Sequence, residues 1–155
     1  MPWGSTALDD VDQRIVAALI ADGRMSMRSL ASQVHISRAN VYARVERLTR
    51  EGVIEGFEAR VDPARAGLRT SAYIGIHVEQ NAWRELAEQL AQIPYVGHVA
   101  LLSGEFDVLL RIDAPDNTVL RDVVLEQIQQ LAGVRATRTW LVFEDRRGQA
   151  PFGVE

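Results

Sequence analysis

The chain has 155 residues, of which 47% are hydrophobic and 25% charged, and this size and composition are typical of one large globular domain or two small ones. The absence of cysteine excludes disulfides, thiolate metal sites and a cysteine nucleophile. The chain shows no basic and apolar leader and no apolar run near the roughly 18 residues of a membrane span, so we expect a cytoplasmic protein without a membrane partner.

The formal net charge of −4 hides a local excess of positive charge. Between Arg24 and Arg50 there are six arginines and a single acid, Glu46, whereas residues 9–22 hold four acids and one arginine. A basic stretch bounded in this way favours a local contact with a polyanion such as DNA over general coating of nucleic acid.

Three short helices are predicted in the first third of the chain. Asp9, Ser26 and Ser37 are suitable N-caps, and Gly23 and Gly52 follow the first and third helices. Turns of three to four residues join the helices, and the last two form the angled pair of a helix-turn-helix. The apolar positions on the inward faces are Ile15, Val16, Leu19, Ile20, Met27, Leu30, Ala31, Val34, Val41, Val45 and Leu48.

A change of pattern after the third helix predicts the domain boundary. Residues 53–62 alternate apolar and polar side chains from Phe57 onward, which predicts an extended strand or wing. Residues 62–67 have the composition of a linker. We therefore expect a helix-turn-helix DNA-binding domain with a wing or linker strand over residues 1–62, and an effector-binding and oligomerisation domain over residues 68–155.

The second half predicts the order strand, helix, strand, strand, helix, strand. Gly104 and Glu105 are expected to form a two-residue type II′ turn between the two middle strands. This order is typical of a ferredoxin-like βαββαβ domain, so the chain is assigned to the α+β class, a winged helix-turn-helix followed by that domain. The expected elements are strand 72–79, helix 82–93, strands 95–103 and 106–114, a helix from Pro115 to Gly133, and strand 134–144.

The sheet face opposite the two helices has no predicted element to cover it. Because the strands carry apolar side chains on both faces, we expect a second subunit to cover the bare face. The protein is therefore predicted to be a homo-oligomer, at least a dimer. The apolar side chains behind this prediction are Val99, Leu101, Leu109, Leu141 and Phe143.

A series of short motifs runs in order through both halves. They are Leu8-Asp9 with Asp12 and Ile15, Asp22-Gly23-Arg24, Leu30-Ala31, Ser37, Arg44-Val45 with Leu48, Glu51-Gly52 with Ile54, Gly56-Phe57, Ser103-Gly104-Glu105-Phe106-Asp107, Gly133-Val134 and Thr137-Arg138-Thr139. In these residues the chain resembles the Lrp/AsnC (leucine-responsive regulatory protein/asparagine-synthase regulator) family of bacterial and archaeal transcription factors, over about Leu8 to Asp145. The resemblance implies a transcriptional regulator that binds double-stranded DNA, responds to a small amino-acid effector, and assembles from dimers into tetramers or octamers.

Two positions depart from the family pattern. His35 stands where the family usually has glycine between the second and third helices, so we expect His35 to adopt a positive φ. Arg38 stands where the family usually has proline, which puts a charge at the start of the third helix.

The third helix supplies the candidate DNA-binding residues. With Val41, Val45 and Leu48 inward, a helical wheel places Arg47 and Arg50 on the outward face. Small side chains permit close approach to the groove floor, and asparagine and arginine match adenine and guanine edges. A merely solvated helix face is the alternative that the charge alone leaves open. The candidates are Ser37, Arg38, Ala39, Asn40, Tyr42, Ala43, Arg44, Arg47 and Arg50.

The resemblance also implies an effector site, at the hairpin and the final strand. Gly104 would let a ligand approach the backbone, and Asp107 would face its ammonium group. Thr137 and Thr139 would offer hydroxyls from one face of the strand. A glycine turn with polar ends is the simpler alternative. The candidate effector-binding residues are Ser103, Gly104, Glu105, Asp107, Thr137 and Thr139.

Two other functions stay open for a chain of this architecture. A siroheme-decarboxylase-like enzyme would use histidines near a tetrapyrrole, and a DNA-architectural protein would wrap DNA without an effector. His35, His77 and His98 form no metal-ligand spacing, since the first and second strands of a ferredoxin-like sheet are not neighbours. No hydrolase or nucleotide-binding motif occurs, so we expect no catalytic residue, no metal site and no cofactor.

Overall fold

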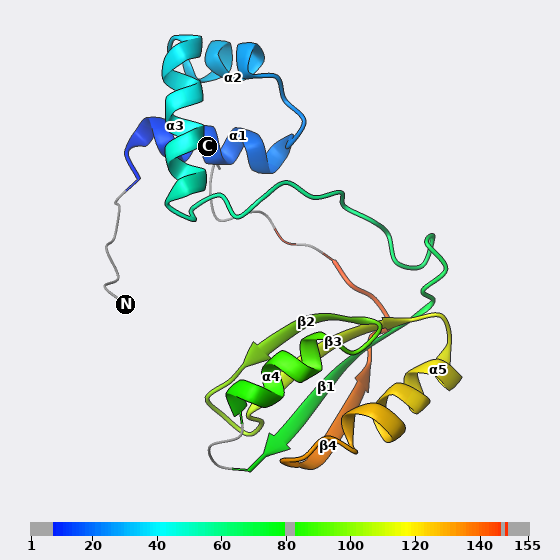
Figure 1. The fold of residues 1–155 in the computed structure, drawn as a ribbon. Coiled ribbons are helices and arrows are strands. Elements are labelled where there is room, and N and C mark those ends of the chain that lie inside the picture. Colours follow the sequence, from blue (N-terminus) through cyan, green and yellow to red (C-terminus); the bar gives the residue numbers. More distant parts are fainter. Residues whose placement is uncertain (1–7, 80–82, 147, 149–155) are drawn as a thin grey trace. The chain divides into compact units, whose positions relative to one another are not determined.

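The computed structural model describes residues 8–79, 83–146 and 148 (Figure 1). Its contacts divide the chain into a first unit up to Arg60 and a second unit from Val61 to Arg146. Over the described residues, none of the helices has the length and apolar character needed to cross a bilayer.

The first unit consists of three helices, α1 (Asp10–Ala21), α2 (Met27–Val34) and α3 (Arg38–Arg50). The predicted N-caps are confirmed, because the side chains of Asp9, Ser26 and Ser37 each accept a hydrogen bond from a backbone N–H of the first turn. These bonds satisfy donors that a helix start otherwise leaves unpaired. The core contains Ile15, Val16, Ala18, Leu19, Leu30, Ala31, Val34, Val41 and Leu48.

His35 ends α2 in the left-handed region, with φ 57° and ψ 45°, as the sequence predicts. Its backbone N–H donates to the Ala31 carbonyl and closes the helix. A side chain at such a φ carries a steric cost that glycine avoids, and histidine tolerates it better than bulky or branched residues. The departure from the family pattern therefore leaves the turn between α2 and α3 intact.

The strand predicted over residues 53–62 is wrong for this chain, because no residue of that segment pairs with another strand. Val53 and Ile54 both donate their backbone N–H to the Leu48 carbonyl, at 2.9 and 3.1 Å, which closes the end of α3. Beyond them the segment lies outside helices and strands. An alternating sequence forms a ladder only where a second extended segment supplies hydrogen bonds, and the described part of the first unit offers none.

The second unit has the predicted ferredoxin-like order. The four strands form one antiparallel sheet in the order β2-β3-β1-β4, and both helices cover the same face (Figure 1). Ala72, Ile74 and Ile76 of β1 are fully buried beneath the helices. The elements are β1 (Thr70–Val78), α4 (Trp83–Ala91), β2 (Val96–Leu101), β3 (Val108–Ala114), α5 (Asn117–Asp122), a π-helical continuation (Val123–Ile128) and β4 (Val134–Leu141).

The two-residue hairpin predicted at Gly104 and Glu105 is wrong. The strands stop pairing at Leu101 and Val108, so residues 102–107 form a longer loop, and Gly104 does not adopt a left-handed φ. The far end of the loop is fixed on both sides. The backbone N–H of Asp107 donates to the Ile76 carbonyl of β1 at 3.0 Å, and the Asp107 carbonyl accepts the N–H of Leu102, the residue after β2, at 2.9 Å.

The register shows which side chains lie on each face of the sheet. Val99, Leu101 and Leu141 lie opposite Leu110, Val108 and Ala72, so they belong to the face that the helices cover. Phe143 lies beyond β4 and is 98% exposed. Of the five apolar side chains that indicate strands apolar on both faces, Leu109 is placed on the open face by its pairing with Ala100. The open face carries Tyr73, Gly75, His77, His98, Ala100, Leu109, Arg111, Asp113, Ala136, Arg138 and Trp140.

Candidate DNA-binding and effector-binding sites

The outward surface of α3 combines small and cationic side chains. Ala39 and Ala43 are exposed one turn apart, and Arg50 is exposed near the end of the helix. On one flank the Arg38 guanidinium lies 5.6 Å from the centre of the Tyr42 ring, which is a cation–π arrangement. Tyr42 is itself 49% exposed. This surface has the composition that close approach to a DNA groove requires.

Arg44 and Arg47 do not project outward with the other candidates. Arg44 Nη1 lies 2.7 Å from both Asp9 Oδ2 and Asp12 Oδ1, and Arg47 Nη2 lies 2.6 Å from Asp12 Oδ2. Asp12 is only 2% exposed. The outward placement of Arg47 by the helical wheel is therefore wrong, because a long arginine side chain bends to a carboxylate on the neighbouring helix.

These ion pairs shift the ionisation of the groups involved. Burial alone raises the pKa of Asp12, but hydrogen bonds from Arg47 and Arg44 outweigh burial and bring this pKa below its ordinary value. The hydrogen bond from Arg44 likewise lowers the pKa of Asp9. The same bonds raise the pKa of both arginines, so the cluster is fully charged at neutral pH.

Sequence reasoning missed the role of Asp12, although a signal was present. Asp12 precedes Ile15, Val16 and Leu19 by three, four and seven residues, which is the spacing of one helix face. A carboxylate on an otherwise apolar face needs a cationic partner, since an unpaired buried charge is strongly unfavourable. The arginines of α3 supply this partner.

The effector candidates of the loop are exposed, and the loop is anchored by its polar ends. The Asp107 carboxylate accepts the backbone N–H of Val78 at 2.9 Å and lies 3.9 Å from His77 Nδ1. Glu105 forms an ion pair with Arg138 of β4 at 3.4 Å. A side chain added at Gly104 would meet no atom within 4 Å, so this part of the loop is open.

Thr137 and Thr139 lie apart from this open loop surface. They pair with Ile76 and Ile74, so their side chains lie on the face that the helices cover. The Thr137 hydroxyl also accepts a hydrogen bond from Gln129 Nε2 at 2.7 Å. The two threonines share a strand face, as the sequence predicts, but this is not the face over which the loop folds.

Phe106 connects the loop to the open sheet face, and sequence reasoning missed it. Its ring lies 4.6 Å from the His77 ring and 5.2 Å from the Trp140 ring, centre to centre. A Cβ at Gly75 would come within 2.8 Å of this ring, so only glycine fits beneath it. The Arg138 guanidinium lies 5.8 Å above the Phe106 ring centre. The loop is thus held across β1 and β4.

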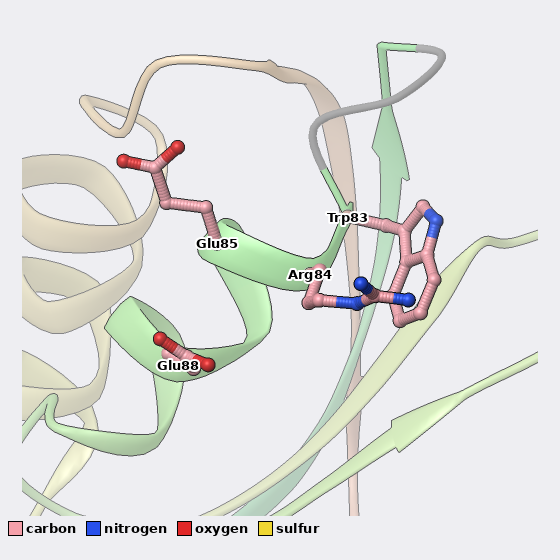
Figure 2. Close-up of a pocket in the computed structure, with 4 residues that line it drawn as sticks. All are labelled: Trp83, Arg84, Glu85 and Glu88. Carbon is pink, nitrogen blue, oxygen red and sulfur yellow. The ribbon is translucent and has the colours of Figure 1, made fainter. Parts of the chain in front are cut away.

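Neither the histidines of the sheet nor the pocket on α4 includes a candidate DNA-binding or effector-binding residue. His77 and His98 lie on β1 and β2, which β3 separates, and no group of three metal-ligating side chains occurs among the described residues. A shallow pocket on α4 is lined by Trp83, Arg84, Glu85 and Glu88. Figure 2 shows the Arg84 guanidinium stacked on the Trp83 ring, 5.0 Å from its centre.

Comparison with known families defines the class of protein first. Residues 8–55 match a winged helix-turn-helix DNA-binding family, and residues 71–148 match the Lrp/AsnC ligand binding domain. A DNA-binding module followed by a ligand-binding module is the composition of a transcriptional regulator. The chain belongs to the Lrp/AsnC family of transcriptional regulators, as the sequence motifs indicate.

Individual relatives agree with this assignment. The HTH-type transcriptional regulator AldR of Mycolicibacterium smegmatis is 38% identical over 147 residues, which cover 93% of this chain and 86% of AldR. The crystal structure of MtbAldR has a TM-score of 0.76 at 35% identity and covers 93% of this chain and 100% of that one. A regulator from Neisseria meningitidis in complex with L-Met shares the fold, with a TM-score of 0.85 at 23% identity over 94% and 96% of the chains. The comparisons point to DNA-binding regulators, not to enzymes.

Proposed function

We propose that the protein is an effector-responsive transcriptional regulator that binds double-stranded DNA through the outward surface of α3. The observation that carries this proposal is the exposure of Arg38, Tyr42 and Arg50 around two alanines on a single capped helix. Ser37 caps the helix, and Asn40 adds an exposed amide beside it. Arginine and tyrosine bind phosphates and bases, while the alanines allow the helix backbone to come close.

Binding to selected genomic fragments tests this surface. A DNA site is first isolated by selection and footprinting with the wild-type protein. Arg38→Gln and Arg50→Gln are each expected to weaken binding to it by about 1 to 3 kcal/mol if the side chain contacts a base edge. Arg84→Gln on α4 makes the same charge change outside α3 and serves as the control. Unchanged affinity in both α3 variants would contradict the proposal, and equal affinity for random DNA would favour the architectural alternative.

We propose that the effector is a small molecule with an ammonium group, an amino acid, bound at loop 102–107. The exposed Asp107 carboxylate and the open space beside Gly104 support this site. The bound methionine of the Neisseria regulator concerns that protein, and it gives a chemical precedent for the ligand. Effector and DNA binding are then coupled, typically by about 1 to 3 kcal/mol, and the coupling is equal in both directions.

A thermal-shift screen of the twenty amino acids tests the effector site. A ligand at about 100 times its dissociation constant stabilises the folded protein by about 2.7 kcal/mol, which is readily detected. Asp107→Asn is the appropriate variant, because an amide oxygen still accepts the Val78 N–H while the negative charge is lost. We expect Asp107→Asn to abolish the response and Glu88→Gln on α4 to leave it unchanged. An identical response in Asp107→Asn would place the ligand elsewhere.

We also propose that the open sheet face is covered in a homo-oligomer, with dimers assembling further into tetramers or octamers. Trp140, 41% exposed, and the neighbouring Leu109 and Tyr73 support burial of this face. Multi-angle light scattering measures the assembly directly. A stable monomer of 17.3 kDa at micromolar concentration would contradict the proposal.

A further inference from the structure

Asp12 is the one buried polar residue in the described part of the chain, and both of its carboxylate oxygens are used. Arg44 donates to Oδ1 at 2.7 Å, and Arg47 donates to Oδ2 at 2.6 Å. The Asp9 backbone N–H also approaches Oδ2 at 3.4 Å, as part of the capping box of α1. This carboxylate joins the first helix to the DNA-binding helix.

The two arginines are correspondingly occupied. Besides Asp12, Arg44 bonds Asp9 and donates through Nε to Asn40 Oδ1 at 3.0 Å. Arg47 also bonds Glu51 at 3.1 Å. Their side chains are only 24% and 28% exposed. Each guanidinium therefore has two carboxylate partners and a fixed direction along the flank of α3.

The remaining arginines of α3 differ from this pair. Among the described residues, Arg38 and Arg50 form no ion pair, and both are exposed. Either arginine can therefore bind a DNA phosphate without first leaving a carboxylate. For Arg44 or Arg47, the same contact would remove one of the two cations that pair with the buried Asp12 carboxylate, which is unfavourable. Two of the four arginines are thus available to bind DNA, and the other two are held by Asp12.

We propose that Asp12 is a positioning residue for DNA binding, which withholds Arg44 and Arg47 from DNA and fixes α3 on α1. The surface that meets DNA is then the strip of Arg38, Ala39, Tyr42, Ala43 and Arg50. This inference rests on the proposed use of α3 and specifies which of its cations contribute. On this proposal the Asp12 carboxylate, although it lies outside the contact surface, limits the affinity of the protein for DNA of any sequence.

The salt dependence of DNA binding tests this role with a readout that simple destabilisation would not produce. The probe is a random-sequence duplex of about 30 base pairs, titrated by fluorescence anisotropy between about 50 and 200 mM salt, where each neutralised phosphate contributes about −0.9 to the slope of log K against log salt. We expect Asp12→Asn to release arginine and steepen the slope by about 0.9 or more, although the variant is less stable. Asp10→Asn, an equal charge change at an exposed site of the same turn, should match the wild type.

A second pair of variants tests the same inference from the arginine side. Arg47→Gln should leave the slope unchanged, whereas Arg50→Gln should make it shallower by about 0.9. Circular dichroism at the assay temperature confirms folding, and where Asp12→Asn does not fold, the Arg47→Gln slope decides. A slope for Asp12→Asn equal to that for Asp10→Asn, or a shallower slope for Arg47→Gln, would overturn the inference. Unchanged slopes in both Arg38→Gln and Arg50→Gln would instead contradict the use of α3 itself.

Discussion

Each unit of the chain contains a cluster of arginine and aspartate, and the two clusters lie at different places in their folds. Asp12 joins α1 to α3 from within the core, and its side chain is 3% exposed. Arg111 lies on the open face of the sheet, 20% exposed, where it pairs with Asp113 at 3.3 Å and with Asp145. The hydrogen bonding of Arg111 to the Asp113 carboxylate is the largest reason why the pKa of Arg111 is raised. The first cluster holds two helices together, whereas the second lies on the sheet face opposite the apolar core.

This difference follows from the size of each core. Three short helices enclose nine buried hydrophobic residues, while the sheet and its helices enclose thirteen. A small core depends more strongly on each specific contact that fixes how its elements cross. We therefore expect polar substitutions to be costly in the first unit and apolar truncations to be costly in the second. Urea unfolding of the full chain, with hydrogen exchange by mass spectrometry assigning the affected unit, measures both.

The largest effect is expected for Leu110→Ala in the second unit. Leu110 is fully buried on a central strand, and such truncations cost about 2 to 5 kcal/mol through lost burial and a residual cavity. Leu141→Ala is the control, since Leu141 is 47% exposed at the sheet edge. Equal losses in the two variants would show that the apolar core does not hold this unit.

Asp12→Ala should cost about 2 to 3 kcal/mol, less than breaking a fully enclosed pair because the arginines retain some solvent. Hydrogen exchange should accelerate in α1 and α3 and stay unchanged in the sheet. Asp10→Ala should change little, because Asp10 is exposed. A loss that appears equally in both units would contradict the local character of the cluster.

Acid should weaken the first unit through the same carboxylates. Because the folded pKa values of Asp9 and Asp12 lie below the ordinary value of 3.8, their contribution is fully present above that pH and is lost as the pH falls through the folded values. Unfolding measured from neutral pH downward should show this loss below pH 3.8. Asp12→Asn should flatten the profile, and a wild-type profile in that variant would contradict the role of Asp12.

Gly75→Ala should cost about 1 to 2 kcal/mol, because the added methyl group overlaps the Phe106 ring. Gly104→Ala is the matched control, since its Cβ meets nothing within 4 Å and its φ is not left-handed. Exchange should accelerate in loop 102–107 for Gly75→Ala alone. If the two variants are equally stable, Phe106 is not held by the close approach at Gly75.

Arg111→Gln should have the smallest effect, about 1 kcal/mol or less, since partly exposed ion pairs contribute little to stability. We expect Arg111→Gln to change self-association instead, because the side chain lies on the open sheet face. A loss as large as that of Asp12→Ala would remove the distinction between the two clusters.

Much of the fold was predictable, because it depends on local signals. Caps at Asp9, Ser26 and Ser37 determine where the helices begin, and the alternation in β1 shows which side chains are buried. The positive φ of His35 followed from a family pattern of glycine at one position. Such features require only neighbours within a few residues, so periodicity and backbone sterics are sufficient to infer them.

The direction of the arginines and the faces of the strands were decided only by tertiary structure. Arg44 and Arg47 meet Asp12 across 32 and 35 residues of chain, and only the crossing of α1 and α3 brings these charges together. The loop end at Phe106 and Asp107 is fixed on β1, because Gly75 leaves room for the ring and Val78 offers a backbone donor. In each case the interacting groups are far apart in the sequence, and only the packed arrangement of the helices and strands brings them into contact.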